Sequence, residues 1–492
     1  MKFLTKAQQH NIGFDFVMAH LTPLTCYGKE RKDAIDWYSA AEKPVLLRKL
    51  QQLQAFKIFF DKYPEDIAAL TNILTRFKEI RGIIRQINAQ VEPLDEVELF
   101  QLKNFAIDCQ HLWQAVEEFQ LTLLDHQLYS LHDTVTLLNP DDQITRTFAI
   151  DSRYATALEQ IRVAKTEIEH QINAQPEPDK QLLNLHTQLT EQERKAEYQV
   201  CQNLTDRLRI SVPEVANNIT YIAELDFLIA KATLADAFGA VAPQFLDTDT
   251  IKIQEAVNPW VNDILNKDGK SFTPLSLSLN QGANVLTGAN MGGKTVALAT
   301  LTLNILLAHC GLFVFCRSLS LPVLDFLFYL AHDYQSVTAG VSSFGAEVRQ
   351  ITRMIEQMGD GRGFAVVDEF ARDTNPEEGQ TMVRTLLRLC EKHNSFCLLS
   401  THFSKIVERD MQHLQVVGLR NAPLETLSPV RAEKTVNHLQ EMMDFTIEAV
   451  PWDNPAPKDA VRVAKLMGLP QEFLDLIDDE TWENAFGNQT ES

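Results

Sequence analysis

The sequence of 492 residues predicts a multidomain protein in which a largely helical first half is followed by an α/β domain. Glycine is nearly absent between Gly28 and Gly239, Gly82 being the exception, and apolar residues in this half recur at helical spacing. From residue 251 to 419, short apolar runs alternate with helical segments, which is typical of a mostly parallel sheet. These runs are 283–286, 312–315, 364–367 and 396–399. Because one core rarely serves more than about 250–300 residues, the two patterns are assigned to separate domains.

The helical half divides into three parts. Residues 1–150 show leucine and isoleucine stripes and are expected to form a helical core. Residues 151–210 contain two long helical stretches around 175–179, where two prolines interrupt the backbone ladder, so a helical hairpin is the simplest outcome. The hairpin tip, 171–179, has two acids and no base, which counts against tight clamping of DNA. Residues 211–240 include a strongly apolar helix that would return the chain to the helical core.

Composition limits the class of protein. The net charge of −21 is unlike that of a general nucleic-acid binder, although it leaves room for a local basic patch. None of the seven cysteines lies in a CxxC motif, so buried thiols in a reducing cytosol are expected rather than a zinc site or a disulfide scaffold. The N-terminus lacks the apolar segment of a signal peptide. The apolar run 296–315 reads as a buried helix leading into a strand, so we expect a cytoplasmic protein without a membrane span.

A glycine-rich segment has the spacing of a phosphate-binding loop, and it lies within the predicted nucleotide domain of residues 241–440. Its residues are Gly288 and, after four positions, Gly293, Lys294 and Thr295. These glycines, together with Gly292, let backbone N–H groups curl around a phosphate, and the following helix directs its positive end at the same charge. Lys294 is expected to reach the outer phosphates, and the Thr295 hydroxyl to complete a Mg²⁺ shell. The flanking strand and helix patterns support a site for a nucleoside triphosphate such as ATP.

A second buried run, 364–367, ends in the two acids Asp368 and Glu369. In a triphosphatase the first carboxylate holds Mg²⁺ through water and the second polarises the attacking water. His402, after the run 396–399, could sense the γ-phosphate, although a lone histidine is more often structural. Ser342 and Ser343 follow a glycine at the start of a helix, where they could bind an anion or simply cap the helix.

Four segments, in the same order along the chain, resemble motifs of the MutS family of ATPases. The segments are 287–295, which resembles TGPNMGGKS with Ala289 in place of proline; Ser342-Ser343-Phe344 with Glu347, which resembles S-T-F-x-x-E; 368–379, which resembles D-E-x-x-R-G-T; and 400–403, which resembles A-T-H-Y. The resemblance is close over 251–419. The helical half is similar to the family's core, lever and clamp only in pattern. Residues 459–470 resemble its dimerisation helices, expected within 441–492.

The resemblance implies a fold and roles for individual residues. The second domain would be an ABC-type P-loop ATPase with C-terminal dimerisation helices. Asn290, Met291 and Lys294 would belong to the phosphate site, Thr295 and Asp368 would hold Mg²⁺, and Glu369 would act on the attacking water. Ser342 would complete the neighbouring subunit's site, which implies a homodimer with two composite ATP sites. Asp373 stands where the family has glycine, so the geometry of that loop is expected to differ.

Two functions remain open from the sequence. The chain starts directly in the helical region, so the family's mismatch-reading domain is expected to be missing. The first hypothesis is a clamp that binds duplex or branched DNA, related to mismatch repair or recombination. The second is an ATP-driven remodelling factor for a protein partner, since 368–379 also resembles reactivation subunits of cobalamin-dependent aminomutases. Salt-dependent DNA binding separates the two.

Overall fold

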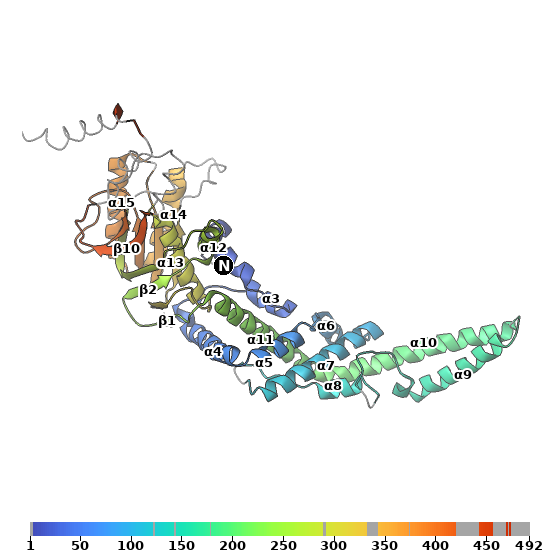
Figure 1. Ribbon diagram of the computed structural model, residues 1–492. Helices are drawn as coiled ribbons and strands as arrows, with labels where there is room; N and C mark the ends of the chain where they lie inside the picture. The colour runs from blue at the N-terminus through green and yellow to red at the C-terminus, as the bar shows by residue number, and fades with distance from the viewer. Residues whose placement is uncertain are drawn as a thin grey trace, which may run out of the picture. The chain divides into compact units, whose positions relative to one another are not determined.

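The computed structural model describes residues 3–121, 124–141, 144–177, 179–288, 292–331, 343–372, 374–419, 442–455, 469–470 and 472–473 (Figure 1). The chain forms two compact units. The helical unit comprises residues 21–34 and 52–232, and the α/β unit comprises 1–20, 35–51 and 233–492. The chain passes from one unit to the other several times. Two of these passages, between residues 51 and 52 and between residues 232 and 233, fall inside the continuous helices α4 (Lys43–Lys62) and α11 (Val212–Phe238).

The described residues of the helical unit contain helices and no strand, as the first half of the sequence predicts. Besides parts of α4 and α11 they form α3 (Cys26–Asp33), α5 (Pro64–Leu74), α6 (Arg81–Ala89), α7 (Glu96–Glu118), α8 (His132–Leu137), α9 (Thr156–Asn173), α10 (Lys180–Leu208) and the short 3₁₀ helices η2 (Ser152–Tyr154) and η3 (Arg209–Ser211). Capping residues set several boundaries; Asp95 accepts the backbone N–H of Glu98 at 2.8 Å at the start of α7.

Helices α9 and α10 lie side by side as a hairpin joined near residue 175, and polar pairs hold them together (Figure 1). Arg162 of α9 contacts Glu193 and Glu197 of α10, each at 2.8 Å, and Lys165 contacts Glu193 at 2.6 Å. Only Leu158 of α9 is fully buried. The hairpin therefore uses its facing charges to join its own two arms.

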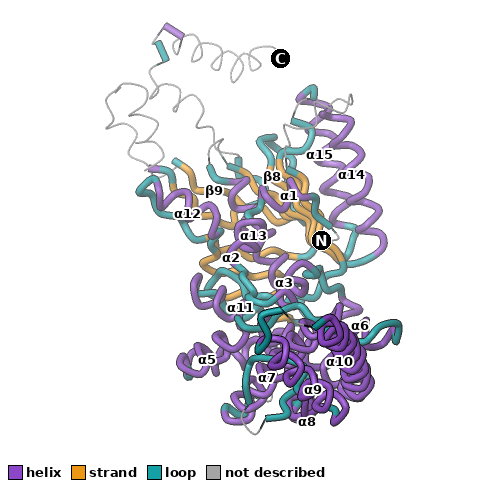
Figure 2. The backbone as a smooth tube through the Cα atoms, turned by 90° about the vertical axis from the view of Figure 1, so that its right-hand side faces the viewer, coloured by secondary structure: helices purple, strands orange, loops and turns teal. Residues whose placement is uncertain are grey.

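The α/β unit is built on two sheets, drawn in orange in Figure 2. The larger has the order β10-β9-β4-β8-β7-β6, and all its neighbours are parallel except β10 and β9. Its strands are β4 (Gly282–Thr287), β6 (Phe326–Leu330), β7 (Gly363–Asp368), β8 (Phe396–Ser400), β9 (Gln412–Gly418) and β10 (Asp444–Val450). The smaller, β1-β5-β2-β3, consists of β1 (Gln244–Phe245), β2 (Thr250–Ala256), β3 (Leu275–Asn280) and β5 (Ser318–Leu321).

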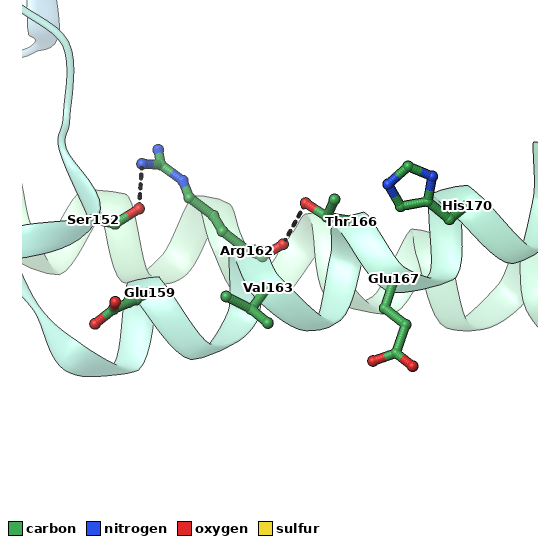
Figure 3. Close-up of a pocket in the computed structure, with 7 residues that line it drawn as sticks. All are labelled: Ser152, Glu159, Arg162, Val163, Thr166, Glu167 and His170. Atoms are coloured by element: carbon green, nitrogen blue, oxygen red, sulfur yellow. Dashed lines mark hydrogen bonds between the residues drawn. The ribbon is translucent and has the colours of Figure 1, made fainter.

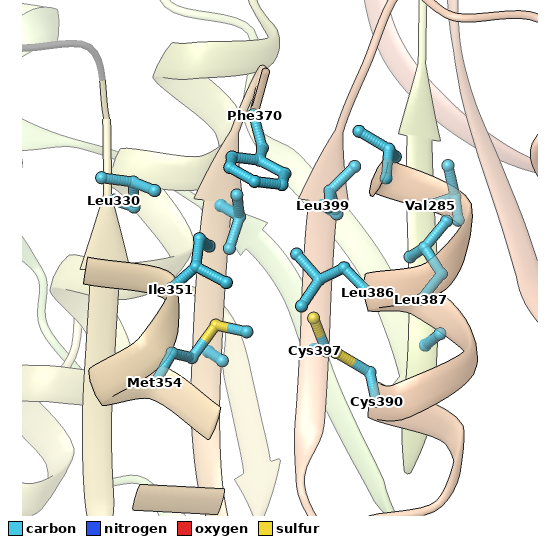
Figure 4. Packing of buried hydrophobic residues seen from close by; sticks show 14 of the residues in the cluster. Val285, Leu330, Ile351, Met354, Phe370, Leu386, Leu387, Cys390, Cys397 and Leu399 are labelled. Carbon is cyan, nitrogen blue, oxygen red and sulfur yellow. The ribbon is translucent and has the colours of Figure 1, made fainter. Parts of the chain in front are cut away.

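The helices of this unit are α1 (Lys6–Asn11), α2 (Phe14–His20), η1 (Ala40–Glu42), α12 (Pro259–Lys267), α13 (Lys294–His309), α14 (Ser343–Asp360) and α15 (Pro376–Glu391). One face of the large sheet is covered by α14 and α15 through the apolar cluster shown in Figure 4. Ile351 and Met354 of α14 and Leu387 of α15 meet strand residues such as Leu399 in this cluster. This packing fixes the strand ends that carry the polar residues.

Segments at the beginning of the chain also belong to the α/β unit. Gln8 Nε2 donates to the Tyr329 carbonyl of β6 at 2.5 Å, and Asn258 Nδ2 donates to the Ile12 carbonyl at 3.0 Å. Trp37 stacks on His309, the last residue of α13, with ring centroids 3.8 Å apart. The predicted domain boundaries at 150, 210, 240 and 440 stay predictions.

One strand predicted from the sequence was wrong. The run 312–315 is buried as expected but makes only an isolated bridge, Val314 with Val241, because the small sheet takes the next segment, β5, as its strand. Within 441–492 residues 444–450 form strand β10, which was not predicted, and the dimerisation helices expected in this region stay a prediction. The alternation of Phe445, Ile447 and Ala449 with polar residues has the period of a strand. Residues 456–468 and 474–492 lie outside the described part of the chain.

Candidate functional site

The polar residues singled out in the sequence follow three neighbouring strands, β4, β8 and β7. These strands are parallel, and Ser400 of β8 is in register with Leu286 of β4 and with Asp368 of β7. Their carboxyl ends therefore meet at one edge of the sheet, which is where ligands bind in open α/β sheets. The phosphate loop begins at Gly288, directly after β4. The fold brings these separate motifs to one place.

The phosphate loop ends at the start of α13. Gly293 has a φ of 75°, a left-handed conformation that favours glycine, and it precedes Lys294, the first helical residue. The Lys294 side chain is 6% exposed, and its Nζ donates to the Gly288 carbonyl at 3.0 Å. The ammonium thus lies across the mouth of the loop, where a phosphate oxygen could replace the carbonyl as its acceptor.

Thr295 and Asp368 form the centre of the site. The Thr295 hydroxyl donates to Asp368 Oδ2 at 2.7 Å, and the Ser400 hydroxyl donates to Asp368 Oδ1. Asp368 is 7% exposed, so its carboxylate is held by two hydroxyls in a largely buried position. A hydroxyl and a carboxylate in contact suit Mg²⁺, which binds through few protein oxygens and keeps waters and phosphate oxygens as its other ligands. The residues present fit that ion.

Glu369 directly follows Asp368 in the chain, and its side chain is 12% exposed. Its Oε1 is 3.6 Å from Lys294 Nζ, and its Oε2 accepts from Arg372 NH1 at 2.9 Å. The backbone N–H of Glu369 donates to the Ser400 carbonyl at 3.1 Å. Glu369 and Ala371 both have left-handed φ angles, 52° and 58°. Such angles cost non-glycine residues about 1–3 kcal/mol each, and strain of this kind collects at functional sites.

His402 follows β8 at the same edge and is exposed, although its ring is partly desolvated. Burial lowers the pKa of the imidazole, and the nearby charges of Arg372 and Lys294 also lower it, while Glu369 opposes them. The ring is therefore neutral at physiological pH and could donate one hydrogen bond to a phosphate oxygen. The backbone N–H of Thr401, its neighbour, donates to the Leu286 carbonyl at 3.1 Å and fixes this turn beside β4.

The structure brings together Gly288, Gly292, Gly293, Lys294, Thr295, Asp368, Glu369 and His402 at this edge. Asn290, Met291 and Ser342 lie outside the described residues, as does Asp373. Ser343 is the first residue of α14, which agrees with a position at a helix start. The anion-binding and capping alternatives for the serines therefore both stay predictions.

Three residues of the site had no assigned role in the sequence. Ser400 holds Asp368, Arg372 pairs with Glu369, and Glu347 Oε2 accepts the Ala371 N–H at 3.2 Å. Ser400 becomes visible only through the register of β8 with β7. Glu347 stands within a quoted motif, but its partner lies 24 residues away. Of the three, only Arg372 lies close in sequence to its partner, because it follows Glu369 by three residues.

Comparison with known proteins agrees with these motifs. Residues 284–480 match the family model described as MutS domain V. Similar proteins include the endonuclease MutS2 of Agathobacter rectalis, 28% identical over 258 residues (50% of this chain, 31% of that protein). Those of Leuconostoc citreum, 24% identical over 378 residues (75% and 46%), and Thermomicrobium roseum, 29% over 280 residues (55% and 33%), are also similar. The chain thus spans less than half the length of these relatives. The domain match covers every motif of the site from the phosphate loop onward, so residues 284–480 are similar to MutS domain V.

Proposed function

We propose that this protein is an ATPase that hydrolyses ATP with Mg²⁺ at the joined ends of β4, β7 and β8. The observation that carries the proposal is the hydrogen bond of 2.7 Å between Thr295 and Asp368, with Lys294 and Glu369 beside it. A phosphate loop, a metal-binding pair and a second carboxylate are the parts that triphosphate hydrolysis requires. The similarity to MutS domain V supports the same activity.

The chain's own residues would divide the work in a defined way. Lys294 would exchange the Gly288 carbonyl for an outer phosphate oxygen, and backbone N–H groups of Gly292 and Gly293 would face the same phosphates. Thr295 and Asp368 would hold Mg²⁺, which offsets charge on the phosphate oxygens. Glu369 would accept a hydrogen bond from the attacking water and orient it. His402, neutral at this position, would donate to the γ-phosphate.

Replacing Lys294 with alanine tests the phosphate site. Loss of a charge-assisted hydrogen bond is expected to raise the Kd for ATP by about 10- to 100-fold. The measurement is titration calorimetry with a slowly hydrolysed ATP analogue and Mg²⁺. Lys392→Ala is the matched control, because Lys392 is an exposed lysine at the end of α15. Equal affinities for the two variants would remove Lys294 from the site.

We further propose that two copies of the chain form a homodimer in which Ser342 completes the partner's site, and that ATP turnover moves the helical arms. The resemblance of 287–403 to the MutS motifs supports the shared site. The continuity of α4 and α11 through the boundaries of the two units supports the transmission of motion, because a helix without a break transmits displacement along its axis.

We propose DNA, duplex or branched, as the partner, with a role related to mismatch repair or recombination that does not read mismatches. The similarity to MutS domain V and relatives named as endonucleases support this partner. The hairpin argues for weak binding. Figure 3 shows a hollow beside α9 where Arg162 lies with two acids, Glu159 and Glu167. Because Arg162 is already engaged by Glu193 and Glu197, it has little charge left for a phosphate backbone.

A DNA titration tests this partner. Fluorescence anisotropy of labelled duplex and branched DNA, with and without ATP, is expected to show binding at low salt that weakens steeply as salt rises. Arg194→Gln, at an exposed position of α10, is expected to reduce the salt slope by about one if the hairpin carries the contact. Arg162→Gln is the control, because Arg162 is already paired with Glu193 and Glu197 within the hairpin. The absence of binding at low salt would rule DNA out and favour a protein partner.

A further inference from the structure

Arg372 lies beside the carboxylate that the proposed ATPase would use on water. Its NH1 donates to Glu369 Oε2 at 2.9 Å, while Lys294 Nζ lies 3.6 Å from the other oxygen, Oε1. Both oxygens of Glu369 therefore face cations. The hydrogen bond from Arg372 occupies one acceptor position of Oε2 and fixes the orientation of the carboxylate, so the group is less free to turn toward water.

The two cations differ in what would release them. Lys294 starts the phosphate helix, and it would leave Glu369 when phosphate oxygens enter the loop. Arg372 lies at the outer side of the loop after β7, with its side chain 50% exposed. Arg372 contacts Oε2, whereas Lys294 faces Oε1, so the departure of Lys294 does not by itself break the contact of Arg372. A second event must therefore separate Arg372 from the carboxylate.

The loop that carries this ion pair is held from α14. Glu347 Oε2 accepts the backbone N–H of Ala371, which has a left-handed φ of 58° and is fully buried. On the other side Gly379 of α15 packs closely, since a Cβ there would lie 2.9 Å from the Ala371 carbonyl oxygen. Left-handed angles at Glu369 and Ala371 persist only when neighbours enforce them. A shift of α14 would consequently let the loop relax and change the position of Arg372.

We propose that Arg372 is a positioning residue that holds Glu369 in an inactive arrangement, and that the contact of Glu347 with Ala371 couples this latch to the position of α14. The proposal rests on the proposed ATPase function. It adds regulation to that site, because a movement of α14 (Ser343–Asp360) would change the contact of Glu347 with Ala371 and so open the latch.

Steady-state hydrolysis by Arg372→Ala tests the latch. A half-exposed ion pair is worth at most about a fivefold shift in population, so kcat is expected to rise by about two- to fivefold. The KM for ATP is expected to stay unchanged, because Arg372 binds the carboxylate and not the nucleotide. Arg372→Lys, which keeps the charge with fewer donors, should fall between wild type and Arg372→Ala. Arg353→Ala, at an exposed arginine of α14, should match wild type in both constants.

Each other outcome has a distinct meaning. If wild type turns over ATP and Arg372→Ala has an equal or lower kcat, the latch is wrong and Arg372 is neutral or supports catalysis. If KM changes and kcat does not, Arg372 contacts the nucleotide instead. If wild type and all variants fail to hydrolyse ATP, the proposed function itself fails. Circular dichroism of the variants, compared with wild type, shows that the fold is retained in each case.

Discussion

The variant Glu369→Gln is expected to bind ATP with nearly wild-type affinity and to hydrolyse it about 10²- to 10⁴-fold more slowly. Glutamine has almost the same shape, and neither Lys294 nor Thr295 is altered, so the phosphate and Mg²⁺ contacts remain. The amide lacks the negative charge that polarises water. In the structure the carboxylate is 12% exposed, and Glu369 directly follows Asp368 at the end of β7. Phosphate release and nucleotide binding are measured on the same preparation.

Glu378→Gln provides the control for this substitution, because Glu378 is an exposed acid in the first turn of α15. Its turnover should equal that of wild type. A Glu369→Gln protein that still hydrolyses ATP at the wild-type rate would show that another group activates the water. Loss of ATP binding in Glu369→Gln would instead mean that Glu369 supports the loop through its contact with Lys294.

The second large effect concerns His309, which ends the phosphate helix α13. Its ring is fully buried and stacked on Trp37, and Nδ1 donates to the Tyr38 carbonyl at 2.9 Å. Within the described residues Nε2 has no hydrogen-bond partner. Burial lowers the pKa of His309 to about 3, while the bond to Tyr38 opposes this shift. The folded protein thus keeps this histidine neutral where the unfolded chain, with a value of 6.5, takes up a proton.

The sign of the pH dependence follows. As pH falls below 6.5, His309 binds a proton in the unfolded state but not in the folded state. The contribution of His309 to the free energy of unfolding therefore falls by about 1.4 kcal/mol per pH unit. His309→Asn keeps a donor for Tyr38 and does not titrate. The stability advantage of wild type over His309→Asn, measured by urea unfolding, should therefore shrink from pH 6 toward pH 4 at about this rate. An advantage that stays constant with pH would contradict the neutral buried state.

His393→Asn is the matched control for this pH series. His393 lies in the same unit, in the turn after α15, and is only partly buried. This variant shows how replacing a histidine by asparagine at a less buried position of the same unit changes stability at each pH. Because the chain has two units, the comparison uses differences between variants at each pH, and each unfolding curve is followed by two probes to separate the transitions.

The phosphate loop and the acidic pair could be predicted from the sequence because their signal is local. Gly288, Gly293, Lys294 and Thr295 lie within one turn and one helix start, and Asp368 directly ends an apolar run. The chemistry of each group is carried by its residue type and its place at a strand end. The parallel order of β4, β8 and β7 then brings the groups together, as the alternating pattern predicted.

The parts that could not be predicted depend on contacts between distant segments. Ser400 holds Asp368 only because the two strands are in register, and Glu347 reaches Ala371 only because α14 packs on the sheet. The attachment of Gln8 to Tyr329 spans 321 residues and has no sequence pattern of its own. Strand β10 was not predicted, and its pairing with β9 brings together segments that lie more than 25 residues apart in the chain.

In the described residues no helix is long and apolar enough to cross a membrane, and no group of three or more histidine, cysteine or acidic side chains could hold a metal ion. The proposed Mg²⁺ site is compatible with the latter finding, because Thr295 and Asp368 supply only two ligands and the remainder would come from ATP and water.

The measurement that tests the central claim most directly is phosphate release from ATP by the purified full chain, with and without Mg²⁺, alongside Lys294→Ala. The arrangement of Lys294, Thr295, Asp368 and Glu369 predicts steady Mg²⁺-dependent release by wild type and its loss both in Lys294→Ala and after chelation. Release that is equal in wild type and Lys294→Ala, or that persists without the metal, would contradict the assignment of ATP hydrolysis to this site.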